Sequence, residues 1–350
     1  AVQLAGIGYL LQGITNNAIS FTAGVIIATV IAVLFSYIAG IHSVMWTDAL
    51  QALIMIISAT AVVLVVIHQL GGFSEFFYNL ETNYAEMLSV PGNGYFNFLT
   101  FLGLTIPWFF FSLSNPQVSQ RLFMPASLKD LRVMLLGFLV FAVVYTFVSI
   151  IWGFSAIQMF PDLETPDLAT PMLLSSGIIP TILGIIVMVG IFAAAVSTID
   201  SILLTLSSMF ARDVYGNMGK ERTDAQQLKV GKVVIPMIAV LAFLFAKLEL
   251  NLIAVLSVAA SAGLIVTVPA FFGVFFWKRG TAAGVISSVT IGALFVLILE
   301  FTGSKPFGLW PGIWGIITST VLFVVVSLLT KAPEQKADEF IGYVKEQLNK

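Results

Sequence analysis

Long apolar runs, separated by short polar connections that often contain glycine or proline, make up most of the sequence. Within the runs the apolar character is continuous, whereas a membrane-spanning β-strand alternates apolar and polar residues. Most runs reach the roughly 20 residues that a helix needs to cross a bilayer. We therefore predict an all-α membrane protein with about ten transmembrane spans, the first of them partial. The predicted spans are 1–14, 20–40, 43–68, 94–117, 133–158, 176–210, 229–247, 251–276, 281–302 and 308–330.

The composition agrees with a location in lipid and narrows the function. Hydrophobic residues make up 59% of the 350 positions and charged residues 10%, whereas a soluble domain has about 25% charged residues. The mean hydropathy is +1.01. A net charge of −2 gives no basis for nucleic-acid binding. Because the sequence contains no cysteine, it excludes disulfides, thiol catalysis and thiolate metal sites.

The basic residues lie almost entirely on one alternate set of connections and on the C-terminal tail, residues 331–350. This side holds fourteen of the sixteen Lys and Arg residues, and cytoplasmic loops of membrane proteins carry such an excess. We therefore expect a multi-pass protein of the cell (plasma) membrane with a cytoplasmic C-terminus. The fourteen residues are Arg121, Lys129, Arg132, Arg212, Lys220, Arg222, Lys229, Lys232, Lys278, Arg279, Lys331, Lys336, Lys345 and Lys350.

The tail itself predicts a short amphipathic helix. Phe340, Ile341, Val344 and Leu348 share one face at helical spacing. We expect a surface helix, and the alternative is a helix that lies in the membrane interface.

Two aspartates, Asp48 and Asp200, lie inside predicted spans and away from their ends. An acidic residue at a helix centre costs roughly 2.5–3.5 kcal/mol to insert, so it usually faces a polar cavity or a partner. At 1.5 Å per residue, Asp48 is about 9 Å and Asp200 about 15 Å from the cytoplasmic end of its span. These depths let the two residues share one site. For Asp48, stabilisation by the dipole at a helix N-terminus explains its position equally well.

A stripe of hydroxyl residues accompanies Asp200. Ser197, Asp200 and Ser201 are spaced i, i+3 and i+4 and line one helical face, which Thr205 and Ser208 continue. Hydroxyls, carbonyls and a carboxylate are the oxygen ligands that a hard cation prefers. The alternative is that each hydroxyl bonds to a carbonyl one turn earlier, as is common in membrane helices. For the stripe together with its aspartate, we favour a cation site.

A second candidate site lies in the predicted span 94–117. Gly103, Pro107 and Pro116 are expected to interrupt this helix. Broken helices at the middle of a membrane free backbone groups that bind substrates and ions in transporters. The alternative is a kinked helix whose aromatic residues serve only in packing.

Four segments resemble motifs of one transporter family. They read AAAVSTIDSILLTLSSMFARDVY (193–215), GIHSVMWTDALQ (40–51), PAFFGVFFWKRGTAAG (269–284) and NPQVSQR (115–121). Through them the chain is similar to the sodium/solute symporter family, which holds the proline, pantothenate, monocarboxylate, sialic acid and sugar cotransporters. The resemblance covers the whole chain.

The resemblance implies a LeuT-type fold, in which ten core helices form two inverted five-helix repeats with flanking helices. On this pattern, residues 1–330 are a single transmembrane transporter domain. Residues 1–68 are the remainder of the first repeat, 94–276 the complete second repeat and 281–330 two helices that follow the core. The chain begins on apolar residues without an initiator Met. We therefore expect an N-terminal truncation that removes core helices one and two and half of the family's conserved sodium site.

Carried over by position, the resemblance implies two groups of ion ligands. The ligands of the conserved sodium would be the carbonyl of Ala194 and the hydroxyls of Ser197 and Thr198. Those of a second sodium site, or of the path by which sodium leaves, would be Asp48, Asp200 and Ser201.

The resemblance also implies sodium-coupled symport by alternating access, with Na+ as the co-transported ion and without an enzymatic reaction. Trp108 and Phe111 align with aromatic positions that contact or cap the substrate in relatives. A sugar-type member would show an amide where Trp108 stands, which favours an amino acid such as proline or a carboxylate such as pantothenate. The expected partners are this solute, sodium and the lipid bilayer, without nucleic acid.

Two alternatives keep the buried aspartates but change the function. In proton-coupled transport by the same fold, Asp200 would take up and release a proton. An intramembrane aspartyl protease also needs two aspartates on neighbouring helices. Its usual Gly-x-Gly-Asp motif is missing, because Asp200 follows Ser-Thr-Ile.

Overall fold

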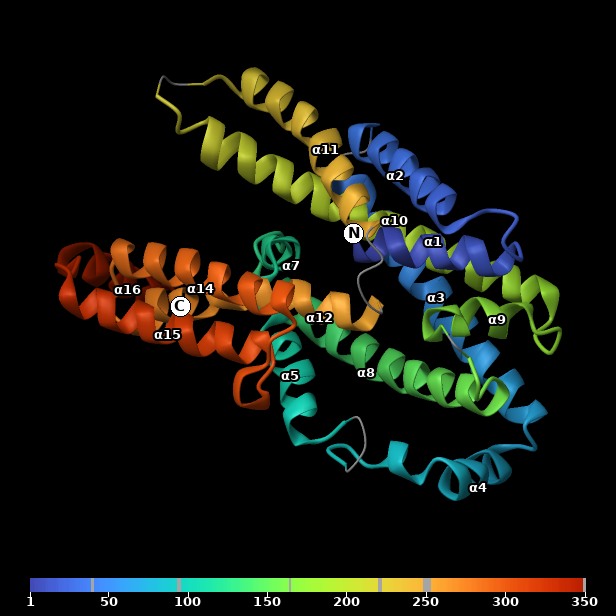
Figure 1. Ribbon diagram of the computed structural model, residues 1–350. Coiled ribbons are helices and arrows are strands. Elements are labelled where there is room, and N and C mark those ends of the chain that lie inside the picture. Colours follow the sequence, from blue (N-terminus) through green and yellow to red (C-terminus); the bar gives the residue numbers. More distant parts are fainter. Residues whose placement is uncertain (39–40, 93–95, 164, 220–221, 248–252, 349–350) are drawn as a thin grey trace. The chain divides into compact units, whose positions relative to one another are not determined.

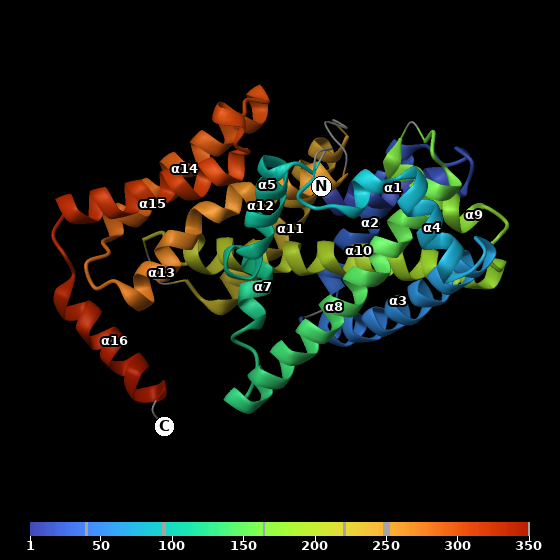
Figure 2. The ribbon, with the colours of Figure 1, turned by 90° about the horizontal axis from the view of Figure 1, so that it is seen from below.

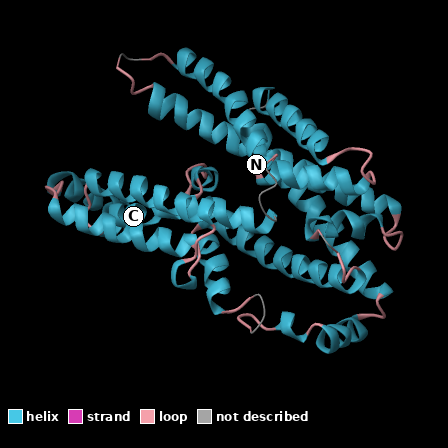
Figure 3. Ribbon diagram, viewed as in Figure 1, coloured by secondary structure: helices cyan, strands magenta, loops and turns pink. Residues whose placement is uncertain are grey.

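Every regular element that the computed structural model describes is a helix, and no strand occurs in the described part of the chain (Figures 1 and 3). The prediction of an all-α protein is therefore confirmed. The described residues are 1–38, 41–92, 96–163, 165–219, 222–247 and 253–348.

The chain forms two compact units. Unit 1 consists of Ala1–Leu88 and Leu122–Ile253, and unit 2 of Ser89–Arg121 and Ala254–Lys350. The α-helices of unit 1 are α1 (Val2–Ile14), α2 (Phe21–Ile38), α3 (Ile41–Gln69), α4 (Phe73–Asn83), α8 (Leu128–Met159), α9 (Ala169–Ser175), α10 (Thr181–Met209) and α11 (Asp224–Ala246). Those of unit 2 are α5 (Phe98–Phe109), α6 (Phe111–Ser114), α7 (Pro116–Arg121), α12 (Ile253–Leu264), α13 (Val268–Phe276), α14 (Ala282–Thr302), α15 (Pro311–Leu329) and α16 (Glu334–Leu348).

Each predicted span coincides with an apolar helix. Within the described residues, eight helical segments are long and apolar enough to cross a membrane, and α1 and α5 are shorter apolar helices. The eight segments are Phe21–Ile38, Met45–Gln69, Leu128–Met159, Thr181–Tyr215, Asp224–Ala246, Ser257–Phe276, Ala282–Thr302 and Pro311–Leu329. Some ends of the predicted spans 20–40, 94–117 and 251–276 fall outside the described residues. The count of about ten spans holds as an approximate one.

Small side chains bring the helices of unit 1 close together. On α2, Ala28 and Ala32 are fully buried, and a Cβ added to Gly24 would lie 3.0 Å from the Cα of Gly8 on α1. Lipid tails are as apolar as the side chains, so close packing of small residues holds such helices together in a membrane. As a result, α1, α2, α10 and α11 share one core.

In unit 2, α14 and α15 lie side by side in both views (Figures 1 and 2). Their contact surface contains small residues, among which Ser288, Ser319 and Ser327 are fully buried. Thr281 caps the N-terminus of α14, because its hydroxyl accepts a hydrogen bond from the backbone N–H of Gly284 at 3.1 Å. The backbone N–H of Thr281 in turn donates to the hydroxyl of Ser327 at 3.1 Å.

The tail forms the predicted helix, α16, and this helix packs within unit 2. The ring of Phe340 lies 5.9 Å from that of Phe275 on α13, and Ile341 is 9% exposed. Next to these contacts, the amino group of Lys278 forms an ion pair with the carboxylate of Asp338. The apolar face predicted from the sequence is therefore partly covered by the protein itself.

The α14–α15 contact yields a stability prediction. Gly284→Leu places a side chain where even a Cβ would lie 3.0 Å from the backbone oxygen of Phe323. We expect overpacking to lower the free energy of unfolding by about 1–3 kcal/mol, measured as an earlier thermal transition of the purified protein. Gly137→Leu on α8 is the matched control, since a Cβ there meets nothing within 4 Å. Equal transitions for the two variants would contradict this packing.

Candidate functional site

The predicted ion ligands lie on α10, which runs without interruption from Thr181 to Met209. Around it pack α1, α2, α3, α9 and α11 of the same unit. The helix continues into a π-helical turn, Phe210–Tyr215, which contains the Arg-Asp-x-Tyr motif. Such turns often occur at functional sites. The segment that raised the strongest expectation in the sequence is thus the central helix of unit 1.

The three predicted sodium ligands lie together. The backbone oxygen of Ala194 accepts hydrogen bonds from the hydroxyls of Ser197 at 3.2 Å and Thr198 at 2.9 Å. The alternative of hydroxyls bonded one turn back therefore describes their geometry in this structure. A hydroxyl that donates its proton keeps its oxygen lone pairs, so the cluster still presents oxygen atoms that a cation can approach. The assignment of these atoms to sodium stays a prediction.

Asp200 is buried inside unit 1 rather than turned toward lipid. Its side chain is 4% exposed, and its Oδ1 accepts a hydrogen bond from the hydroxyl of Ser36 on α2 at 2.8 Å. Ser36 is a residue that the sequence analysis missed. A signal existed, since Ala28, Ala32 and Ser36 follow each other at i, i+4 and i+8 and continue one buried stripe. The sequence could not tell which helix this stripe would meet.

Asp48 and Asp200 belong to the same unit, which is compatible with the predicted shared site. Asp48 lies on α3, which packs along α10, and the charges of the two aspartates are close enough to interact. Asp48 is half-buried, while Trp46 of the same motif is 80% exposed. Ser201 is half-buried, and its backbone oxygen accepts the hydroxyl of Thr205 at 2.7 Å.

A cavity of about 450 Å³ borders the predicted sodium ligands. Ala194 and Thr198 line it, together with polar side chains that the sequence analysis did not single out. Within the described residues, this lining contains no Lys, Arg or His. The lining residues are Gln3, Gly6, Leu10, Met55, Tyr145, Asp167, Thr170, Pro171, Ile191, Ala194, Ala195 and Thr198. Gln3 could have been predicted from the sequence, because an amide inside an apolar run also needs a polar environment.

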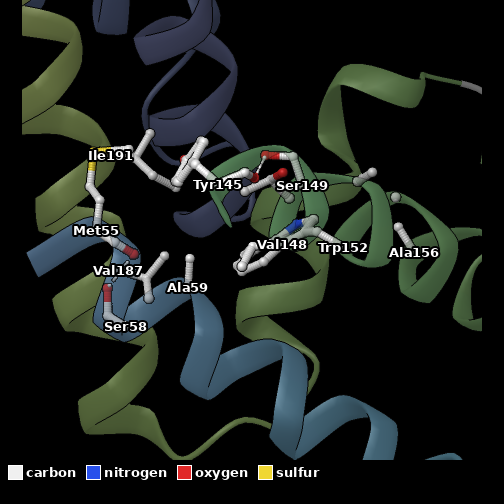
Figure 4. A pocket seen from close by; sticks show the side chains of 13 residues that line it. Met55, Ser58, Ala59, Tyr145, Val148, Ser149, Trp152, Ala156, Val187 and Ile191 are labelled. Carbon is white, nitrogen blue, oxygen red and sulfur yellow. Dashed lines mark hydrogen bonds between the residues drawn. The ribbon is translucent and has the colours of Figure 1, made fainter. Parts of the chain in front are cut away.

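A smaller cavity of about 310 Å³ adjoins the first, and the two share Met55, Tyr145, Thr170 and Ile191. Figure 4 shows how residues of α3 and α10 face residues of α8 across this space. One hydroxyl of its lining is already hydrogen-bonded, because Ser149 donates to the backbone oxygen of Tyr145 at 2.8 Å. The lining of this second cavity is mainly apolar. Together the two cavities enlarge the space next to the predicted ion ligands.

The predicted break in span 94–117 exists, at positions that differ from those expected. The chain forms α5, α6 and α7, with the breaks at Phe110 and Asn115. The helix runs through Gly103 and Pro107, so these two residues do not interrupt it. Gly103 instead leaves room for the ring of Trp310, the residue that precedes α15. The second break directly precedes Pro116, as proline disfavours helical backbone in the residue before it.

The second break frees backbone carbonyls, and a side chain of the same segment binds them. The hydroxyl of Ser119 on α7 lies 3.1 Å from the backbone oxygens of both Ser112 and Leu113. The side chain of Asn115 accepts the backbone N–H of Gln117 at 3.2 Å. Part of the polar backbone that a broken helix can offer to a ligand is thus already paired.

Trp108 and Phe111, the predicted substrate residues, flank the first break. Their ring centroids are 4.8 Å apart and the rings are tilted by 35°. Trp108 is 47% exposed and Phe111 is half-buried, so the ring of Trp108 is open to a ligand. Both residues belong to unit 2, and their contact with a substrate stays a prediction.

Comparison with known proteins identifies the family. A profile of the Sodium:solute symporter family matches residues 1–292. The chain belongs to the sodium:solute symporter family. The high-affinity proline transporter PutP of Bacillus subtilis is 26% identical over 96% of this chain and 72% of its own length. The sodium/pantothenate symporter of Haemophilus influenzae is 25% identical over 93% of this chain and 67% of its own length.

A solved structure supports the same fold. A Na+-coupled sialic acid symporter in a substrate-bound outward-open state matches with a TM-score of 0.72 and 21% identity, over 95% of this chain and 71% of its own. The family resemblance and the LeuT-type fold expected from the sequence are confirmed. As a member of this symporter family, the chain is a multi-pass membrane protein of a class of sodium-linked transporters.

The ligand cluster on α10 yields the first functional prediction. Thr198→Ala removes one predicted sodium ligand. We expect the sodium concentration for half-maximal solute uptake to rise about fivefold to tenfold, because one contact between the ion and an oxygen is lost, with a free energy similar to that of one hydrogen bond. The matched control is Thr146→Ala on α8, whose hydroxyl also bonds one turn back, at 2.7 Å to Ala142. If both variants keep the unmutated sodium dependence, the assignment of Thr198 is wrong.

Proposed function

We propose that this protein is a secondary active transporter that couples the downhill entry of Na+ to the uptake of a small organic solute by alternating access. One observation carries the proposal: in a member of this family, the predicted sodium ligands Ala194 and Thr198 line a cavity of about 450 Å³. A transporter needs an ion site and a solute space in contact, so that occupation of one affects the other.

The chemistry of the cluster on α10 suits a monovalent cation. Na+ is a hard cation that takes oxygen ligands, and the carbonyl of Ala194 with the hydroxyls of Ser197 and Thr198 supplies three without net charge. The buried carboxylate of Asp200 lies on the same helix, and with Asp48 and Ser201 we assign it to a second sodium site or to the exit path. We assign the repeats as the sequence predicts them, with 94–276 as the complete second repeat.

The direction of transport follows from the orientation that we propose. Fourteen of the sixteen basic residues belong to one side, which we assign to the cytoplasm, together with the C-terminus. In a plasma membrane at −100 mV with a tenfold sodium gradient, each Na+ that enters supplies about 2.3 plus 1.4 kcal/mol. One coupled ion therefore sustains a solute gradient of a few hundredfold.

For the solute we propose an amino acid such as proline in preference to a carboxylate such as pantothenate. Relatives include proline and pantothenate transporters. The described lining of the 450 Å³ cavity offers neutral polar groups and the acid Asp167, without a basic side chain. A zwitterion has no net charge and suits such a lining better than an anion. Independently of this cavity, Trp108 and Phe111 of unit 2 stay our sequence-based candidates for a contact with the solute.

Proton coupling is the second candidate function. Asp200 favours it, because a buried carboxylate that accepts from a neutral hydroxyl is also suited to take up a proton.

Ion replacement separates the two functions. Uptake of labelled proline, pantothenate, pyruvate and glucose is measured in cells that express the native gene, at fixed pH, with sodium or with choline outside. We expect proline uptake in sodium and uptake near background in choline, because choline cannot enter a site for Na+. A proton-coupled transporter would be indifferent to the exchange. Uptake of pantothenate in preference to proline would contradict the proposed solute class.

The aromatic pair provides a test of the solute contact. Phe111→Ala removes one ring next to Trp108, and we expect the KM for the solute to rise about tenfold, as expected for a lost stacking and apolar contact, with the sodium dependence unchanged. Phe109→Ala is the matched control, because Phe109 is 76% exposed and belongs to the same segment. A KM shift in both variants or in neither would remove the assignment.

A further inference from the structure

One side-chain hydrogen bond connects two helices that are far apart in the sequence. The hydroxyl of Ser36 on α2 donates to Oδ1 of Asp200 on α10 at 2.8 Å. The two side chains are 3% and 4% exposed. The bond is therefore shielded from solvent and from lipid, and its geometry is set by how α2 and α10 pack.

The packing of α2 holds Ser36 in place. Ala28 and Ala32 precede it on the same stripe and are fully buried, so α2 approaches its neighbours closely enough for a short serine side chain to reach across. Ile199 and Leu203 on either side of Asp200 belong to the core that includes these alanines. A packed core fixes side-chain rotamers, so both ends of the hydrogen bond are held by rigid surroundings.

The bond uses only part of what the carboxylate can accept. An ionised carboxylate has two oxygens and about four acceptor positions. Ser36 fills one of these positions, on Oδ1. A buried negative charge is costly, and a cation at Oδ2 would offset that cost. The nearby charge of Asp48 increases the need for a cation.

We propose that Ser36 is a positioning residue for Asp200: by holding Oδ1, it directs Oδ2 toward a sodium ion that passes through or rests in the second site. This inference rests on the proposed function, since it assumes that Asp200 meets Na+. Ser36 itself acts through the carboxylate. Without the hydroxyl, the carboxylate loses this anchor and rotates among several orientations, so its contact with the ion weakens.

The test compares two buried serines. Ser36→Ala is expected to raise the sodium concentration for half-maximal uptake about fivefold, as expected for one lost hydrogen bond, and to weaken the binding of ²²Na+ to the purified protein by a similar factor. Ser36→Thr keeps a hydroxyl and is expected to restore most of the affinity. The control is Ser155→Ala on α8, a serine 1% exposed whose hydroxyl bonds one turn back to Ile151 at 2.8 Å.

The outcomes separate this inference from the proposed function. If the unmutated protein takes up solute equally well in choline, sodium coupling fails, and the role of Ser36 fails with it. If uptake depends on sodium but Ser36→Ala matches Ser155→Ala in sodium affinity, the positioning role alone is wrong. Both measurements are normalised to the folded protein in a monodisperse chromatographic peak. A variant that loses folded protein but keeps its sodium affinity shows a structural role and also overturns the inference.

Discussion

The need to pair every polar group inside a lipid-embedded fold governs this structure. Water is absent from the bilayer core, so an unpaired polar group there is costly. Serine and threonine meet this need locally, as Thr198 does with the carbonyl of Ala194. An aspartate in the middle of a helix cannot, because the backbone one turn away offers acceptors rather than free donors. Asp200 therefore requires a donor from another helix, and Ser36 supplies it.

Small residues make that pairing possible. A serine side chain is short, so it reaches a neighbouring helix only where the two backbones approach closely. Ala28 and Ala32 provide this approach on α2, and Gly24 does the same against Gly8 on α1. The residues that pack the core of unit 1 thus also determine the geometry around the buried carboxylate. Small residues drive helix association in a membrane. The same pattern of small residues therefore determines both the helix packing and the geometry around Asp200.

The sequence predicts best what a single helix determines. The spans follow from continuous apolar runs, and Ala194, Ser197 and Thr198 meet because the helix places side chains three and four residues apart over one carbonyl. Ser36 and Tyr145 enter the region only through tertiary contacts, which no local pattern specifies. Gly103 shows the converse error. It was expected to break a helix, yet it accommodates Trp310 within a continuous one, because glycine lowers helix propensity without forbidding a helix.

The two kinds of oxygen in unit 1 have different consequences for an ion. In the proposed sodium site, the neutral oxygens of Ala194, Ser197 and Thr198 would bind a cation without adding charge, and the two hydroxyls already have hydrogen-bond partners. A cation must therefore compete with bonds that exist in its absence, which keeps the affinity moderate. In the same proposal, Asp200 would add the charge that makes entry of a cation into the low-dielectric interior favourable. Passage of an ion requires binding that is strong enough for entry and weak enough for release. A neutral cluster with one anchored carboxylate nearby meets both conditions, which a cluster of several free carboxylates would not.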